Sequence, residues 1–164
     1  MFSCYRRHPQ ARTPANPYSS LFEIEAGAYD EIQPGSYVFM DADYARNEWG
    51  PPLPRFEHAL FVLTTVMSRP APERVVVDAG LKASSVDSGM PLVWERPGLQ
   101  VVRVSDEHGV IELAPGTTPP ALGEKLLLVP GHCDPTVNLY DWFVCVRGDR
   151  VEALWPITAR GAGG

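Results

Sequence analysis

Short apolar runs separated by turn-forming residues fill the chain from residue 58 to residue 155. The runs are rich in Val, Ile, Leu and aromatic residues, and Gly, Pro, Asn or Asp stands between them. This pattern is typical of β-strands joined by turns. The predicted strands are His58–Ser68, Arg74–Gly80, Pro91–Trp94, Leu99–Ser105, Val110–Leu113, Lys125–Val129, Trp142–Arg147 and Arg150–Trp155.

The last two runs predict a β-hairpin, because only Gly148 and Asp149 separate them and glycine leads the turn. The 17 prolines and 14 glycines are spread along the chain, which favours short strands and disfavours long helices. We therefore expect a mainly β fold, an antiparallel β-barrel or sandwich of about eight strands.

The region before residue 55 has a different pattern. Tyr37–Met40 is apolar and follows a Pro-Gly turn, which predicts one further strand, and one helical turn is expected over Asp43–Asn47. The prolines and glycine of 50–54 exclude regular structure, so a domain boundary is expected there. We divide the chain into a poorly ordered tail (1–20), a short segment (21–50) and a β-domain (51–161).

Composition and charge exclude several classes of protein. The length of 164 residues suits one domain with a core. The net charge of −6 argues against a nucleic-acid or membrane-surface partner. Only three cysteines are present, too few for a disulfide framework, which indicates a reducing cytoplasm. No apolar run approaches the ~20 residues of a membrane span.

The candidate chemistry follows the strand Lys125–Val129, where Pro130 and Gly131 lead to His132, Cys133 and Asp134. In an extended segment the side chains at i and i+2 share a face, so His132 and Asp134 would point at one spot and Cys133 away. An imidazole with a carboxylate suits a divalent ion such as Mn, Zn, Mg or Ca, in a site left open for water or substrate. Alternatively, His132 caps a turn and Asp134 is the N-cap of a helical turn that begins at Pro135.

The run Pro130–Asp141 (PGHCDPTVNLYD) resembles the signature near the C-terminus of the D-threonine aldolase and D-serine dehydratase family. These are pyridoxal-phosphate lyases of the alanine-racemase fold type, with a helix-and-strand barrel followed by a β-domain. Similar matches occur at Pro34–Asp41, Val77–Lys82 and Asp106–Gly109, and the resemblance runs from about residue 22 to residue 161. It implies that 21–50 is a remnant of the barrel domain, with its last strand at 37–40.

The resemblance also implies site residues. His132 and Asp134 would bind the divalent metal, the backbone of Gly35 and Ser36 would hold the cofactor phosphate, and Gln33 would face the pyridine nitrogen. His108 is the one candidate for a catalytic role; it either reaches the active site or stabilises a hairpin, and the Gly after it favours the structural role.

The resemblance assigns no lysine of this chain to the position of the family's Schiff-base lysine. That lysine lies at the end of the first barrel strand, and the two lysines of this chain, Lys82 and Lys125, lie in other contexts. Lys82 is interpreted as a solvated turn residue.

The function implied is that of a pyridoxal-phosphate and metal-dependent lyase acting on D-3-hydroxy amino acids. The metal would bind the 3-hydroxyl of the substrate, and the cofactor would be the electron sink. The choice between aldolase and dehydratase stays open, although His-x-Asp favours the aldolase. Two hypotheses follow: a C-terminal domain that is active only as a homodimer or with a partner barrel domain, or a catalytically inactive fragment or β-fold interaction domain.

Overall fold

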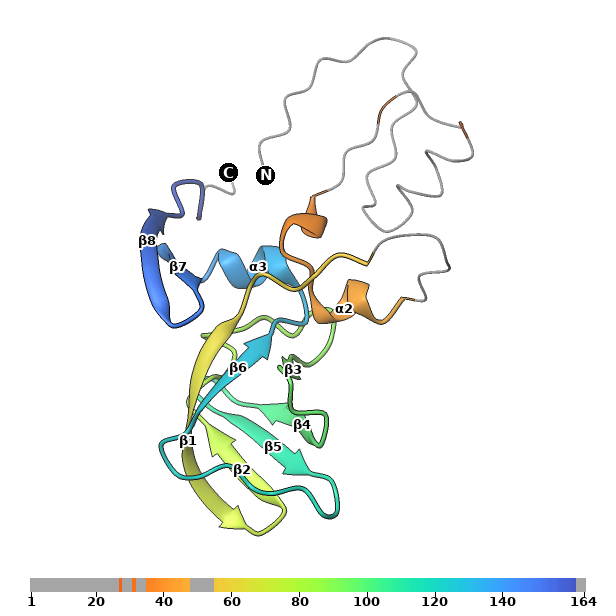
Figure 1. Ribbon diagram of the computed structural model, residues 1–164, viewed down its shortest axis with the longest axis vertical. Coiled ribbons are helices and arrows are strands. Elements are labelled where there is room, and N and C mark those ends of the chain that lie inside the picture. The colour runs from red at the N-terminus through yellow and green to blue at the C-terminus, as the bar shows by residue number, and fades with distance from the viewer. Residues whose placement is uncertain (1–26, 28–30, 32–34, 48–54, 162–164) are drawn as a thin grey trace.

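Six antiparallel strands close into a barrel (Figure 1). The computed structural model describes residues 27, 31, 35–47 and 55–161. The strand order around the barrel is β1-β2-β5-β4-β3-β6. This confirms the mainly β fold class with an antiparallel barrel. The strands are β1 (Val62–Ala71), β2 (Arg74–Val77), β3 (Leu92–Val93), β4 (Leu99–Val104), β5 (Gly109–Leu113) and β6 (Lys125–Val129).

Alternate residues of the strands fill the barrel interior. Ile111 of β5 is fully buried and pairs with Val75 of β2 on one side and with Val101 of β4 on the other. Leu126 and Leu128 of β6 are buried in the same core, whereas Leu127 between them is exposed. This period of two is the pattern that a half-buried strand requires, and each buried aliphatic side chain stabilises the fold by about 1.5–3 kcal/mol.

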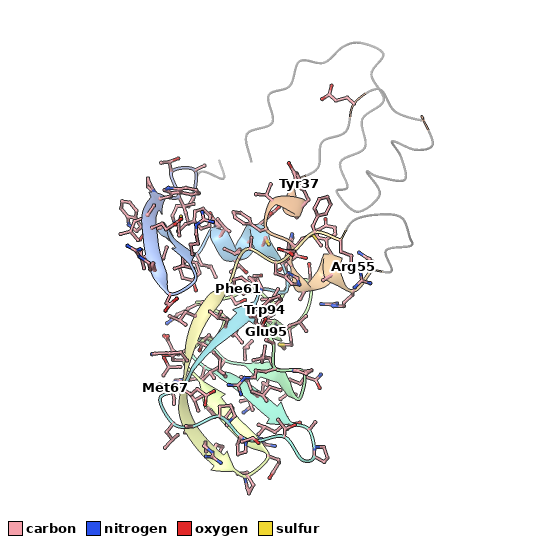
Figure 2. All side chains as sticks on the ribbon, viewed as in Figure 1. Tyr37, Arg55, Phe61, Met67, Trp94 and Glu95 are labelled. Carbon is pink, nitrogen blue, oxygen red and sulfur yellow. The ribbon has the colours of Figure 1, made fainter. Side chains whose placement is uncertain are left out.

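Two aromatic rings lie beside each other where β1 and β3 approach the helices. Figure 2 shows Phe61 and Trp94 together there, with ring centroids 5.1 Å apart. His58 meets Trp94 edge-on at 5.6 Å. His58 therefore packs on an aromatic ring.

The remaining two strands, β7 (Trp142–Arg147) and β8 (Arg150–Pro156), form a separate hairpin outside the barrel (Figure 1). Arg147 pairs with Arg150, so the turn is the two-residue Gly148-Asp149 turn that the sequence predicts. Gly148 has φ +59°, a conformation that glycine adopts without strain. The sequence thus predicted the number of strands and the turn of the hairpin, but it did not predict the division into a six-stranded barrel and a separate hairpin.

One face of this hairpin is apolar and exposed. Its side chains all project from the same side of the two strands, and each is more than half exposed: Trp142, Val144, Val146, Val151 and Leu154. We call these five residues the apolar hairpin face. On the other side, Phe143 packs on Phe39 with ring centroids 5.5 Å apart. An isolated two-stranded sheet has marginal stability. Burial of this exposed apolar face against another surface would stabilise the hairpin.

Three short helices lie beside one end of the barrel: η1 (Ser36–Val38, a 3₁₀ helix), α2 (Ala42–Ala45) and α3 (Cys133–Val137). The strand predicted over Tyr37–Met40 is wrong, because those residues form η1 and the turn after it. An isolated strand has no neighbour for its backbone groups. Here the carbonyl of Ser36 instead accepts the N–H groups of Phe39 and Met40. The helical turn expected near residue 43 is present as α2.

A single buried carboxylate joins α2 to α3. Asp41 is the N-cap of α2, where its Oδ1 accepts the N–H of Tyr44 at 2.9 Å. Its Oδ2 accepts the N–H of Cys133, the first residue of α3, at 3.1 Å. Asp41 is 0% exposed. Beside it, Ala42 N donates to the carbonyl of Pro130 at 2.9 Å, so 35–47 is fastened to the loop that follows β6.

Among the described residues, no helix is long and apolar enough to cross a membrane. The tail predicted over 1–20 and the boundary predicted at 50–54 lie outside the described residues, and the division into three segments stays a prediction.

Replacing Asp41 should destabilise the chain strongly. Asp41→Ala leaves the N–H groups of Tyr44 and Cys133 without their acceptor, and we expect a loss of about 2–4 kcal/mol in the free energy of unfolding, measured by urea denaturation. The matched control is Asp43→Ala, which removes an exposed ion pair with Arg46 and should cost less than about 1 kcal/mol. Equal effects of the two substitutions would contradict the capping role of Asp41.

The apolar hairpin face should drive association. We expect the chain to sediment as dimers or larger species at micromolar concentration, and the paired substitutions Val144→Thr and Leu154→Thr to shift it towards the monomer. Threonine keeps the β-propensity of the strands while removing apolar surface. Val102→Thr, on an exposed position of β4, is the control and should change nothing. A monomeric wild-type chain would disprove the prediction.

Candidate metal centre

The backbone after β6 brings two loops into close contact. A Cβ on Gly131 would lie 2.0 Å from the carbonyl oxygen of Gly89, so only glycine fits at residue 131. Gly89 belongs to the loop between β2 and β3. The close contact between Gly131 and Gly89 places that loop beside His132. His132 has extended backbone angles (φ −145°, ψ 130°) and is the N-cap residue of α3.

His132 is paired with an acid from that loop. Its Nδ1 lies 2.8 Å from Oδ2 of Asp87, and Ser88 Oγ is 3.4 Å away. Partial burial opposes a positive charge on the ring, but the hydrogen bond and charge of Asp87, helped by Asp134 and Asp41, outweigh it and raise the pKa of His132. The same hydrogen bond, with a second from Ser85, lowers the pKa of Asp87 to about 2.

Asp87 is therefore ionised at neutral pH, and an ionised carboxylate only accepts hydrogen bonds. It follows that Nδ1 of His132 carries the proton and donates it, while Nε2 is the ring nitrogen left for another partner. A histidine whose one nitrogen is held by a carboxylate is the usual arrangement of a metal ligand.

Asp134 lies in the first turn of α3 and is exposed. Each local interpretation of the sequence holds only in part, because His132 does cap a turn but shares no extended segment with Asp134. The extended segment ends at His132 because α3 begins at Cys133, and the N-cap is His132 rather than Asp134. Even so, the negative charge of Asp134 contributes to the raised pKa of His132, so the two side chains interact electrostatically.

Cys133 is directed away from this pair. It is buried, and its Sγ donates to the carbonyl of Met40 at 3.2 Å. Burial, and then the charge of Asp41, raise the pKa of the thiol to about 12. A thiol must lose its proton to bind a metal, so Cys133 is unsuited to that role at neutral pH.

The donor set fits an open site rather than a closed one. Within the described residues, no group of three or more His, Cys, Asp or Glu side chains lies together as a metal cage would require. His132 Nε2 and the carboxylate of Asp134 remain as two ligands of the types that divalent ions accept. Water or substrate would complete the coordination.

The residues predicted to hold the cofactor phosphate lie on the segment that Asp41 fastens to α3. Gly35 is exposed and precedes η1, and the buried Ser36 side chain bonds to Tyr44. Gln33 lies outside the described residues. The structure thus brings the segment of α2 and the helix α3 to the same end of the barrel (Figure 1), and the phosphate contact stays a prediction.

His108 and the two lysines lie in exposed positions. The backbone carbonyl of His108 accepts the N–H of Ser105 at 2.8 Å, which makes a tight turn between β4 and β5. Lys82 forms an ion pair with Glu107 of that turn, and the hydrogen bond from Lys82 raises the pKa of its amine. Lys125 donates to Thr65 Oγ1 at 2.6 Å on the barrel surface. Each amine is thus bonded to another side chain on the surface.

Sequence reasoning missed Asp87 and Asp41. Asp87 stands in a Ser-Val-Asp-Ser-Gly run that is typical of a turn, and nothing in the sequence shows that the turn meets a histidine 45 residues later. Asp41 could have been found as a helix N-cap from its position before Ala42, but not as the cap of a second helix.

Comparison with known proteins places the chain in a family. The family described as "Putative serine dehydratase domain" matches residues 59–146, more than half of the chain. A D-threonine aldolase from an Arthrobacter species is 52% identical over 143 residues, and a 3-hydroxy-D-aspartate aldolase from Paracoccus denitrificans is 52% identical over 156 residues. These matches cover 87% and 88% of this chain but 38% of each relative, so the chain spans about two fifths of their length.

The fold agrees with a solved structure. The crystal structure of D-threonine aldolase from Filomicrobium marinum superposes with a TM-score of 0.87 and 47% sequence identity, over 94% of this chain and 43% of that one. The resemblance predicted from the sequence is thereby confirmed, and this chain belongs to the serine dehydratase domain family, with D-threonine aldolase and 3-hydroxy-D-aspartate aldolase among its relatives.

Proposed function

We propose that this chain is the C-terminal metal-binding domain of a pyridoxal-phosphate-dependent lyase that acts on D-3-hydroxy amino acids. The observation that carries the proposal is the pairing of His132 with Asp87, which leaves Nε2 available on a ring that also interacts electrostatically with the exposed Asp134. The names of the relatives support the substrate class, because D-threonine and 3-hydroxy-D-aspartate share an amino group on C2 and a hydroxyl on C3.

His132 and Asp134 would hold the divalent ion, which is Mn, Zn, Mg or Ca. When bound, such an ion would supply a Lewis acid for the C3 hydroxyl oxygen of the substrate. The chain's own residues hold the ligands in place: Asp87 fixes the His132 ring, and Cys133, buried beside Asp41, anchors the start of α3. Both curated relatives are named aldolases, which favours cleavage of Cα–Cβ over loss of the hydroxyl.

The described residues do not by themselves form a pyridoxal-phosphate site. Gly35, Ser36 and Gln33 are the proposed cofactor contacts, but Lys82 and Lys125 are both exposed and bonded to other residues. Neither suits a Schiff base, so we derive no step through the cofactor. Activity would then require a barrel domain, supplied by a partner chain or a homodimer, and the proposed setting is the cytoplasm.

A second candidate is a catalytically inactive fragment or β-fold interaction domain. Two observations favour it: both lysines are engaged on the barrel surface, and the apolar hairpin face offers a docking area without any catalytic requirement. The metal site distinguishes the candidates, because an interaction domain has no need of it.

Titration of the chain with Mn²⁺ and Zn²⁺ by calorimetry tests the proposal. We expect saturable binding that both His132→Ala and Asp134→Ala weaken by about 100-fold or more, since loss of a ligand should cost at least as much as loss of a residue behind it. Asp149→Ala in the hairpin turn removes the same charge as Asp134→Ala and should leave the affinity unchanged.

A chain that binds neither ion, or binds them regardless of both substitutions, would rule out the metal-binding domain in favour of the interaction domain. His108→Ala belongs in the same series: unchanged metal affinity is expected from its exposed position in a turn.

A further inference from the structure

The proposed function relies on the contact between Asp87 and His132, and the surroundings of Asp87 indicate a more specific role for it. Resting on the proposed function, we propose that Asp87 is a positioning residue, which turns the His132 ring so that Nδ1 faces the protein and Nε2 faces the metal. It comes from the β2–β3 loop, 45 residues before His132 in the sequence.

The ring nitrogens of histidine have distinct tasks in such a site. A neutral imidazole binds a metal through the nitrogen that carries no proton, and the partner of the other nitrogen decides which one that is. Asp87 Oδ2, 2.8 Å from Nδ1, can only accept, so it holds the proton on Nδ1. Nε2 then carries the lone pair that a divalent ion requires.

Asp87 is itself held by a closed circuit of hydrogen bonds. Ser85 Oγ donates to Asp87 Oδ1 at 2.7 Å. Oδ2 faces His132 and accepts a longer hydrogen bond from Ser88 Oγ at 3.3 Å. The backbone N–H of Ser85 donates to Thr136 Oγ1 at 3.1 Å, and Thr136 Oγ1 donates to the backbone carbonyl of His132 at 2.8 Å. The circuit therefore fixes both the backbone and the ring of His132.

The solvent exposure of Asp87 and His132 distinguishes a role in positioning the ring from a role in stabilising the fold. The side chains of Asp87 and His132 are 49% and 28% exposed, and ion pairs this accessible to water contribute little to folding. Thr136, by contrast, is 1% exposed and belongs to the support of α3. Removing the Asp87 carboxylate should thus change metal affinity while leaving stability nearly as it was.

Calorimetric titration of the full chain with Mn²⁺ compares Asp87→Ala and Asp87→Asn with the wild type. We expect Asp87→Ala to weaken binding by about 10–100-fold, the usual effect of a residue behind a metal ligand. Asp87→Asn keeps an oxygen that can accept from Nδ1 and should recover part of the loss. Asp149→Ala, with the same change in charge, should bind like the wild type, and the urea midpoints of all four proteins should agree closely.

A second readout needs no metal. In ¹⁵N NMR spectra of the metal-free chain, above the titration of the ring, the wild-type His132 should carry its proton on Nδ1. Asp87→Ala should shift the proton towards Nε2, the form that free imidazole side chains favour, and Asp87→Asn should retain the Nδ1 form.

The outcomes separate this inference from the function on which it rests. Metal binding that depends on His132 and Asp134 but not on Asp87, or an unchanged tautomer in Asp87→Ala, would overturn the positioning role and leave the metal-binding domain standing. A wild-type chain that binds no Mn²⁺ would overturn both.

Discussion

The carboxylate of Asp41 is the interaction on which the candidate site depends. It accepts the N–H of Tyr44 with one oxygen and, with the other, the N–H of Cys133, 92 residues further along the sequence, and so bonds to the first turn of two helices. A buried carboxylate is costly unless its oxygens are bonded, and both are. Because Cys133 follows His132 directly, the position of the candidate metal ligand is set from a segment that is not part of the barrel.

The other side of the site depends on the absence of a side chain. Gly131 approaches the Gly89 carbonyl so closely that any Cβ would collide, and this contact brings Asp87 within reach of His132. The barrel strands supply a rigid base for both loops, since the loop before His132 leaves β6 and the loop of Asp87 joins β2 to β3. The position of the His132 imidazole therefore depends on contacts from two other stretches of chain. Asp41 holds the N–H of Cys133, and the β2–β3 loop packs on Gly131 and supplies Asp87.

The sequence predicted most of the barrel and little of the site's geometry. Lys125–Val129 and Trp142–Arg147 were bounded correctly because their alternation and flanking turns are local signals. Tyr37–Met40 failed because an apolar run is a strand only if neighbouring strands accept its backbone, which no local pattern records. His132 and Asp134 stood out by residue type alone, whereas Asp87 became visible only once the loops were placed in space.

The exposed surfaces bear on what kind of molecule this is. The barrel buries its own apolar core around Ile111. The apolar hairpin face has no such complement among the described residues. A chain matching 38% of its relatives' length leaves the larger part of those proteins unaccounted for. The exposed apolar face and the candidate metal site with only two protein ligands are both features that a partner surface could complete.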